Sequence, residues 1–146
     1  LSGAPLQQGI AVTGAVNQRG ELLPVGGINE KIEGYFRSCK CLGLTGLQGV
    51  LMPRRNLRHL MLDEQVVQAV AAGQFHIHVA DTASEGMALL TGMPYGEMGS
   101  GGYEANSVLG RAQKTLQRFR RACEQLDHKP ALKPNHRRHL GRDIDR

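Results

Sequence analysis

The sequence has 146 residues, 40% of them hydrophobic, and a formal net charge of +5, which suits one ordinary domain with a modest core. No apolar run is long enough to cross a bilayer, and the first residues lack the basic start and apolar stretch of a signal peptide. Three cysteines cannot all pair within one chain, so reduced thiols are expected. We therefore predict a soluble, cytoplasmic protein that makes no contact with a membrane.

From the N-terminus, the first predicted element is a β-hairpin. Residues Ile10–Val16 are apolar and β-prone, Asn17–Gly20 suits a tight turn, and Glu21–Val25 predicts a second short strand. Pro24 has no backbone N–H to donate, so it is expected at the end of that strand or on a sheet edge.

A helix is predicted from Ile28 onward. Gly26 and Gly27 precede it; they suit a strand-to-helix connection better than a phosphate-binding turn, for which two glycines are weak evidence. Lys31 falls in the first helical turn, and Gly43 suits the residue that ends the helix. The apolar positions recur every three or four residues, at Ile28, Ile32, Tyr35, Phe36 and Cys39.

Strand and helix patterns then alternate as far as Gly92. In chain order they are a buried strand at Gly49–Met52 with Pro53 after it, a helix at Asp63–Ala72, a strand at Phe75–Val79, and a helix from Asp81 or Thr82 to Leu90. The predicted fold class is therefore α/β or α+β, with three or four short strands and helices packed on them.

Two groups of possible metal or redox ligands have simpler structural explanations. His76 and His78 lie on one face of a predicted strand and could reach one metal ion, but no third ligand is evident, so solvent-facing histidines are favoured. Cys39 and Cys41 point to different sides of a helix, which favours structural cysteines. Arginines form a basic loop at Arg54, Arg55 and Arg58. Contact with a neighbouring subunit and simple exposure to solvent explain this loop equally well.

The net charge is concentrated in the C-terminal tail. Residues 1–102 hold 7 Lys and Arg against 8 Asp and Glu, whereas residues 103–146 hold 11 against 5. Residues 93–106 form a glycine-rich linker, and 107–146 form a basic tail with a helix at about 107–126 and a disordered end. The apolar face of that helix comprises Val108, Ala112, Leu116, Phe119, Cys123 and Leu126. The tail's charge allows nucleic-acid binding over Arg111–Arg121, although a solvated tail is the commoner meaning of such a pattern.

The segment Val12–Ile32 has a Thr-Gly strand, an Arg-Gly turn, a Pro-x-Gly-Gly strand end and a helix that opens with a lysine. In this order and spacing, the segment resembles the proteolytic domain of Lon proteases. The resemblance covers residues 1–92, which we predict to be the C-terminal part of a Lon-type proteolytic domain, most similar to bacterial Lon-related proteins. It implies a Ser-Lys peptidase in which Lys31 is the general base and Thr13 orients its amine.

The same resemblance implies what other parts of the enzyme would supply. The family's nucleophilic serine lies upstream of the Thr-Gly strand, so Ser2 aligns with a structural position, and no phosphate loop occurs in the sequence. We therefore expect a fragment that lacks the serine and the ATPase domain, with no cofactor in this chain and ATP and Mg in that other domain. The implied partners are unfolded or damaged proteins and further copies in a ring, expected to be a hexamer. The alternatives are an inactive Lon-like binding module whose tail contacts nucleic acid, or a remnant with a frameshifted tail.

Overall fold

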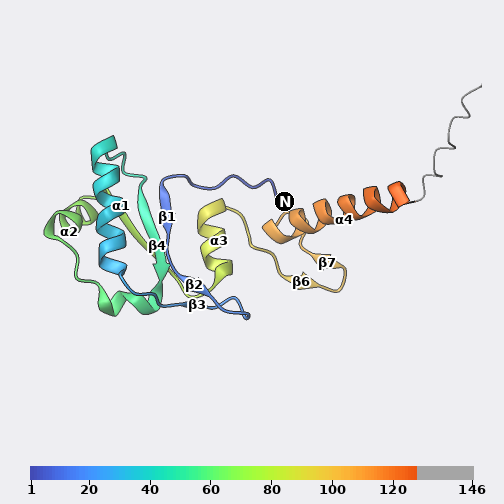
Figure 1. The fold of residues 1–146 in the computed structure, drawn as a ribbon, viewed down its shortest axis with the longest axis horizontal. Helices are drawn as coiled ribbons and strands as arrows, with labels where there is room; N and C mark the ends of the chain where they lie inside the picture. Colours follow the sequence, from blue (N-terminus) through green and yellow to red (C-terminus); the bar gives the residue numbers. More distant parts are fainter. Residues whose placement is uncertain (128–146) are drawn as a thin grey trace, which may run out of the picture.

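Three parallel strands form the centre of the structure, a computed structural model that describes residues 1–127 (Figure 1). The strands are β1 (Ile10–Val12), β4 (Gly49–Pro53) and β5 (His76–Ala80), in the order β1-β4-β5. Ile10 pairs with Gly49, and Val50 pairs with Ile77. All five residues of the middle strand are buried, as predicted for the apolar run that ends at Pro53.

Two helices cover one face of the sheet and a third covers the other. The main core joins α1 (Ile28–Leu42) and α2 (Glu64–Ala71) to β4. Its buried members are Ile28, Ile32, Phe36, Cys39, Val50, Met52, Val66, Ala69 and Phe75. Helix α3 (Ala83–Thr91) lies on the opposite face, where Gly86 packs close to the Leu51 side chain. A short 3-10 helix, η1 (Arg54–His59), follows β4 in the stretch predicted as a loop.

The predicted first strand, Ile10–Val16, is divided in two. Strand β1 ends where Val12 pairs with Leu51, and β2 (Ala15–Val16) then pairs antiparallel with β3 (Leu22–Leu23). At the division, a Cβ on Gly14 would come within 3.1 Å of the Pro53 ring. The predicted hairpin is thus confirmed, but its first strand is shorter than the apolar run.

The C-terminal part contains a hairpin and a long helix. Strands β6 (Met98–Gly99) and β7 (Gly102–Tyr103) pair within the segment predicted as a glycine-rich linker. Helix α4 (Val108–Asp127) follows, with its first turn held by hydrogen bonds from Val108 to Pro94 and from Leu109 to Tyr95. The tail beyond it, predicted to be disordered, lies outside the described residues.

Among the residues that the structure describes, α4 is packed against the preceding chain mainly at its beginning. Val108 is buried, whereas Leu116 and Phe119 of the predicted apolar face are 51% and 50% exposed. Figure 1 shows the helix projecting away from the sheet and its covering helices. Within residues 1–127, no helix is both long enough and apolar enough to span a membrane.

Candidate active site

The predicted catalytic residues both lie at the edge of the sheet where the parallel strands end. Thr13 follows β1 directly, and Lys31 lies in the first turn of α1, the crossover helix that leads from the hairpin to β4. In a parallel sheet, connections that leave the carboxyl ends of the strands gather at one edge, where α/β proteins commonly bind ligands. The topology therefore brings the two residues to the same side of the molecule.

Lys31 is held in place through its backbone. Its N–H donates to the carbonyl oxygen of Gly27 at 3.1 Å, and Gly27 has the left-handed backbone angles φ 65° and ψ 31°. Glycine adopts that conformation without the steric penalty of other residues, which explains the Gly-Gly sequence before the helix. The Lys31 side chain is exposed and makes no hydrogen bond or ion pair with any residue of the described part of the chain.

Thr13 is half-buried, and its N–H donates to the carbonyl oxygen of Leu51 at 3.0 Å, so β4 fixes its backbone. Among residues 1–127, no hydrogen bond joins the Thr13 hydroxyl to the Lys31 amine. The structure thus places both residues at one edge without showing the orienting contact that the resemblance implies.

An apolar pocket of about 160 Å³ opens beside Thr13. Its walls come from the ends of β1 and β4, the β2–β3 hairpin and one side of α3. Two of its lining residues, Val12 and Val16, remain 60% and 58% exposed. The other lining residues are Thr13, Gly14, Leu22, Leu51, Met52, Ala83, Gly86, Met87 and Leu90. Such a surface suits an apolar group rather than a charged one.

Two asparagines that were not predicted as site residues hold the start of α1 in place. Asn56, only 2% exposed, accepts from the Val25 N–H at 3.1 Å and donates to the Val25 carbonyl at 2.9 Å. Asn29 donates to the carbonyl of His59 at 3.1 Å and accepts from the N–H of Met61 at 2.9 Å. Asn56 lies in a segment that looked like a polar loop, and no local pattern distinguishes a buried amide there.

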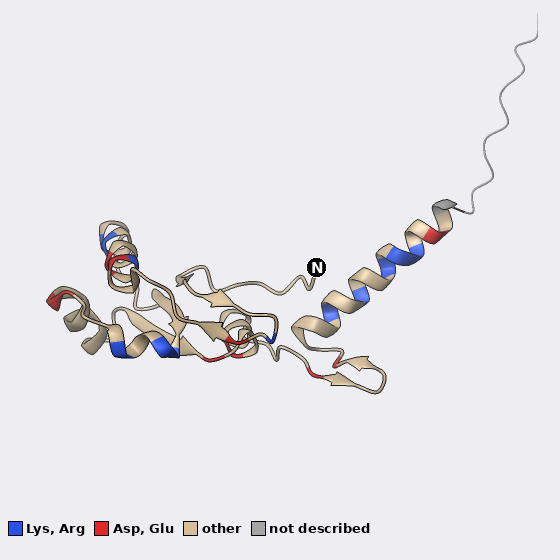
Figure 2. Ribbon diagram, turned by 60° about the horizontal axis from the view of Figure 1, so that its bottom comes forward, with Lys and Arg blue, Asp and Glu red and all other residues tan. Residues whose placement is uncertain are grey.

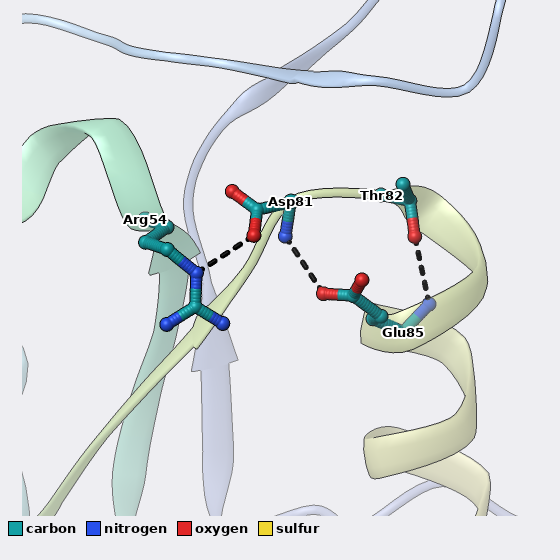
Figure 3. A network of polar contacts seen from close by, with 4 residues as sticks. All are labelled: Arg54, Asp81, Thr82 and Glu85. Carbon is teal, nitrogen blue, oxygen red and sulfur yellow. Dashed lines mark hydrogen bonds and ion pairs between the residues drawn. The ribbon is translucent and has the colours of Figure 1, made fainter.

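A polar network joins η1 to the start of α3 (Figure 3). Arg54 Nε donates to Asp81 Oδ2 at 2.7 Å, and the Asp81 N–H donates to Glu85 at 2.9 Å. The Glu85 N–H in turn donates to the Thr82 hydroxyl at 3.2 Å, which makes Thr82 the N-cap of the helix. The hydrogen bond with Asp81, and then its negative charge, raise the pKa of Arg54. Arg54 is thus paired within the chain, and this network serves structure.

The paired histidines lie on the face of β5 away from the main core, as predicted, but both are half-buried rather than solvent-facing. His76 Nε2 lies 2.8 Å from the carbonyl oxygen of Gly46, and the two imidazole centroids are 5.9 Å apart. Burial, and secondly the charge of His76, lower the pKa of His78. The part of the chain that the structure covers contains no group of three His, Cys, Asp or Glu arranged to hold a metal ion.

The two cysteines of α1 point to different sides, as predicted, since Cys39 is buried in the main core and Cys41 is exposed. Cys39 packs among the apolar side chains of that core. This arrangement supports a structural role for Cys39.

The fold agrees with the comparisons to known proteins. Residues 1–91 match the family model described as the Lon protease (S16) C-terminal proteolytic domain. The chain therefore belongs to the Lon protease family, and its fold is that of the Lon C-terminal proteolytic domain.

Individual relatives show the same kinship. The chain is 48% identical over 90 residues to a Lon protease homolog of Escherichia coli K12, and 42% identical over 92 residues to one of Haemophilus influenzae. These matches cover 62% and 63% of this chain but only 15% of each relative. An archaeal Lon protease of Archaeoglobus fulgidus is 35% identical over 65 residues, which cover 44% of this chain and 9% of that protein. The predicted similarity to bacterial Lon-related proteins is confirmed.

Proposed function

We propose that this chain supplies the lysine of a Ser-Lys dyad to an ATP-dependent serine-type endopeptidase that degrades proteins. The observation that carries the proposal is the position of Lys31, in the first turn of α1 within the region that matches the Lon proteolytic domain. Its exposed amine has no partner in the described chain and is free to meet a hydroxyl group brought to this edge.

In the proposed reaction, the neutral amine of Lys31 accepts the proton of a serine hydroxyl as the serine oxygen attacks the peptide carbonyl. The resulting ammonium then donates this proton to the leaving amine, and water releases the acyl group in a second step. Thr13 orients the amine through its hydroxyl. In the family that this chain resembles, the serine comes from a segment upstream of the Thr-Gly strand.

On this proposal Ser2 is not the nucleophile, because in the family resemblance it aligns with a structural position. Its hydroxyl oxygen accepts a hydrogen bond from the Ala4 N–H at 3.2 Å, in a stretch without regular structure. This contact supports a local turn rather than a role in catalysis.

The proposed substrates are unfolded or damaged proteins, and the proposed assembly is a ring of copies, expected to be a hexamer. The exposed valines of the apolar pocket, Val12 and Val16, support further packing at this edge. ATP and Mg²⁺ belong, on this proposal, to an ATPase domain outside these 146 residues.

A lysine substitution in the protein that carries this segment tests the proposal. We expect Lys31→Ala to lower the rate of ATP-dependent casein hydrolysis by more than about 10³-fold. The reason is that removing one member of a catalytic dyad costs nearly as much activity as removing both. Lys40→Ala is the matched control: Lys40 is an exposed lysine on the same helix that bonds Gln65 at 2.8 Å, and its loss should leave the rate unchanged. Full activity of Lys31→Ala would exclude the dyad.

A second candidate is a Lon-like binding module that contacts nucleic acid. The observation in its favour is the row of basic residues on α4, which Figure 2 shows as blue segments along the projecting helix. All five are exposed: Arg111, Lys114, Arg118, Arg120 and Arg121. This candidate requires an affinity for duplex DNA that falls with added salt and is lost when these residues become glutamine. Lysine-dependent proteolysis without such binding favours the peptidase.

A further inference from the structure

The start of α1 has no capping side chain of its own. The residue before the helix is Gly27, and no side chain there accepts the free N–H groups of the first turn. The Lys31 side chain, exposed and without a hydrogen bond among residues 1–127, contributes nothing to its own placement. The position of the lysine amine therefore depends on the packing of α1 in the main core, through residues such as Ile28 and Ile32, and on the contacts that fix the connection between β3 and α1.

Asn56 fixes that connection. Strand β3 ends at Leu23, so Val25 lacks a strand partner, and the Asn56 amide satisfies both its N–H and its carbonyl, at 3.1 and 2.9 Å. The side chain thus substitutes for a neighbouring strand in binding one residue twice. Because Asn56 is 2% exposed, water cannot readily replace these two bonds.

The side-chain amide of Asn29 also links α1 to the segment around η1, but it lies at the solvent-exposed surface. Asn29, two residues before Lys31, bonds the backbone of His59, the last residue of η1, and of Met61, which follows it. Both of its hydrogen bonds are exposed to solvent, whereas those of Asn56 are partly buried. The segment around η1 therefore makes hydrogen bonds to the connection before α1 and to the first turn of α1. The more buried of these hydrogen bonds are those of Asn56.

We propose that Asn56 is a positioning residue for catalysis: its amide fixes the connection at Val25, and through it the place of the Lys31 amine. The inference rests on the proposed role of Lys31 as general base. Proton transfer requires a base within hydrogen-bond reach of the hydroxyl, so a shift of the helix start by about 1 Å reduces turnover without removing any substrate contact.

The test measures kcat and KM for a fluorogenic peptide, using Asn56→Ala and Asn56→Asp in the protein that carries this segment. Asn56→Ala should lower kcat by about 10²-fold while KM stays within about threefold, because the binding surface is unchanged. Asn56→Asp keeps the side-chain volume and the acceptor for Val25 N–H but lacks the donor for its carbonyl. It should show the same split between kcat and KM, and it decides the question if the alanine variant does not fold.

A core variant separates positioning from simple loss of stability. Val66→Ala removes buried volume from α2 and should also lower the melting temperature. It should leave kcat within about twofold, because in residues 1–127 no hydrogen bond joins α2 to the connection at Val25. The inference is overturned if the Asn56 variants keep full kcat, or if Val66→Ala lowers kcat as much. Lys31→Ala identifies which idea has failed: an active Lys31→Ala protein refutes the dyad, whereas an inactive one beside fully active Asn56 variants refutes only the positioning role.

Discussion

Arg54 and Asp81 form an ion pair, with Arg54 Nε 2.7 Å from Asp81 Oδ2, that ties the end of β4 to the turn between β5 and α3. Both side chains are 51% exposed, so solvent and salt screen the attraction. We expect Arg54→Ala to lower the free energy of unfolding of this domain only slightly, and less at high salt than at low salt. Urea denaturation at low and high salt measures it, with Arg55→Ala as the control; a loss that persists at high salt would contradict a screened surface pair.

The cap of α3 should contribute more than this ion pair. Thr82→Ala removes the hydroxyl that accepts from the Glu85 N–H, and the expected loss is about 1 kcal/mol. Ser84→Ala, an exposed substitution inside the same helix, should be neutral or slightly stabilising because alanine is the better helix former. Thermal unfolding of the two variants compares them directly, and equal melting temperatures would remove the capping role.

Two glycine-to-alanine substitutions should change stability in opposite directions. A Cβ on Gly49 would lie 2.5 Å from the carbonyl oxygen of His76 in the neighbouring strand, so Gly49→Ala must push β4 and β5 apart. We expect a loss of more than about 2 kcal/mol, within the range of overpacked sites. Gly34→Ala, inside α1 with nothing within 4 Å of the new methyl group, should stabilise by about 0.5–1 kcal/mol. Denaturant midpoints measure both, and a tolerated Gly49→Ala would show that the strands can separate at little cost.

Phe75 is the central aromatic residue of the main core. Its side chain is fully buried and meets Phe36 edge-on with ring centroids 5.3 Å apart. Phe75→Ala should lower the free energy of unfolding by about 3–5 kcal/mol, through lost burial and a residual cavity. Val67→Ala, at a 53% exposed position of α2, should cost less than about 0.5 kcal/mol. Similar losses in the two variants, measured by urea denaturation, would mean that this cluster is not the main core.

His78 should make stability depend on pH. Burial and the charge of His76 lower its pKa in the folded domain below 6.5, so between the folded and unfolded pKa values the unfolded chain binds more protons. The stability associated with neutral His78 is fully present above pH 6.5, and it is lost as the pH falls toward the pKa of His78 in the folded domain. His78→Asn should therefore weaken the drop in melting temperature between pH 7.5 and 5. An unchanged pH dependence in the variant would show that His78 is not its source.

The helices were predictable because their signals are local. The apolar spacing from Ile28 to Cys39, and Gly43 at the end, define α1 without reference to the rest of the fold. The break between β1 and β2 was not predictable, because β-prone residues continue to Val16 and only the approach of Pro53 and the pairing with β3 divide the run. In the same way, the apolar face of α4 allowed it to pack as a terminal helix, yet within residues 1–127 Leu116 and Phe119 remain half-exposed.

The candidate site was predictable only in part. Lys31 and Thr13 were found through a motif, and their catalytic roles remain predictions. Asn56 was out of reach, because its importance comes from burial against Val25, which lies 31 residues earlier in the chain. A side chain that pairs with a distant backbone leaves no periodic signal in its own segment.

The parallel pairing of β1 with β4 also determines when β1 can find its partner strand during synthesis on the ribosome. Ile10 cannot find Gly49 until the whole of α1 has been synthesised, which at about 5–20 residues per second leaves the edge of β1 unpaired for a few seconds. During that time Ala15 and Val16 already have a local partner, because they pair with Leu22 and Leu23 of β3. The hairpin of β2 and β3 can thus form before the parallel sheet, and it pairs the end of an apolar stretch that would otherwise be open to misassembly.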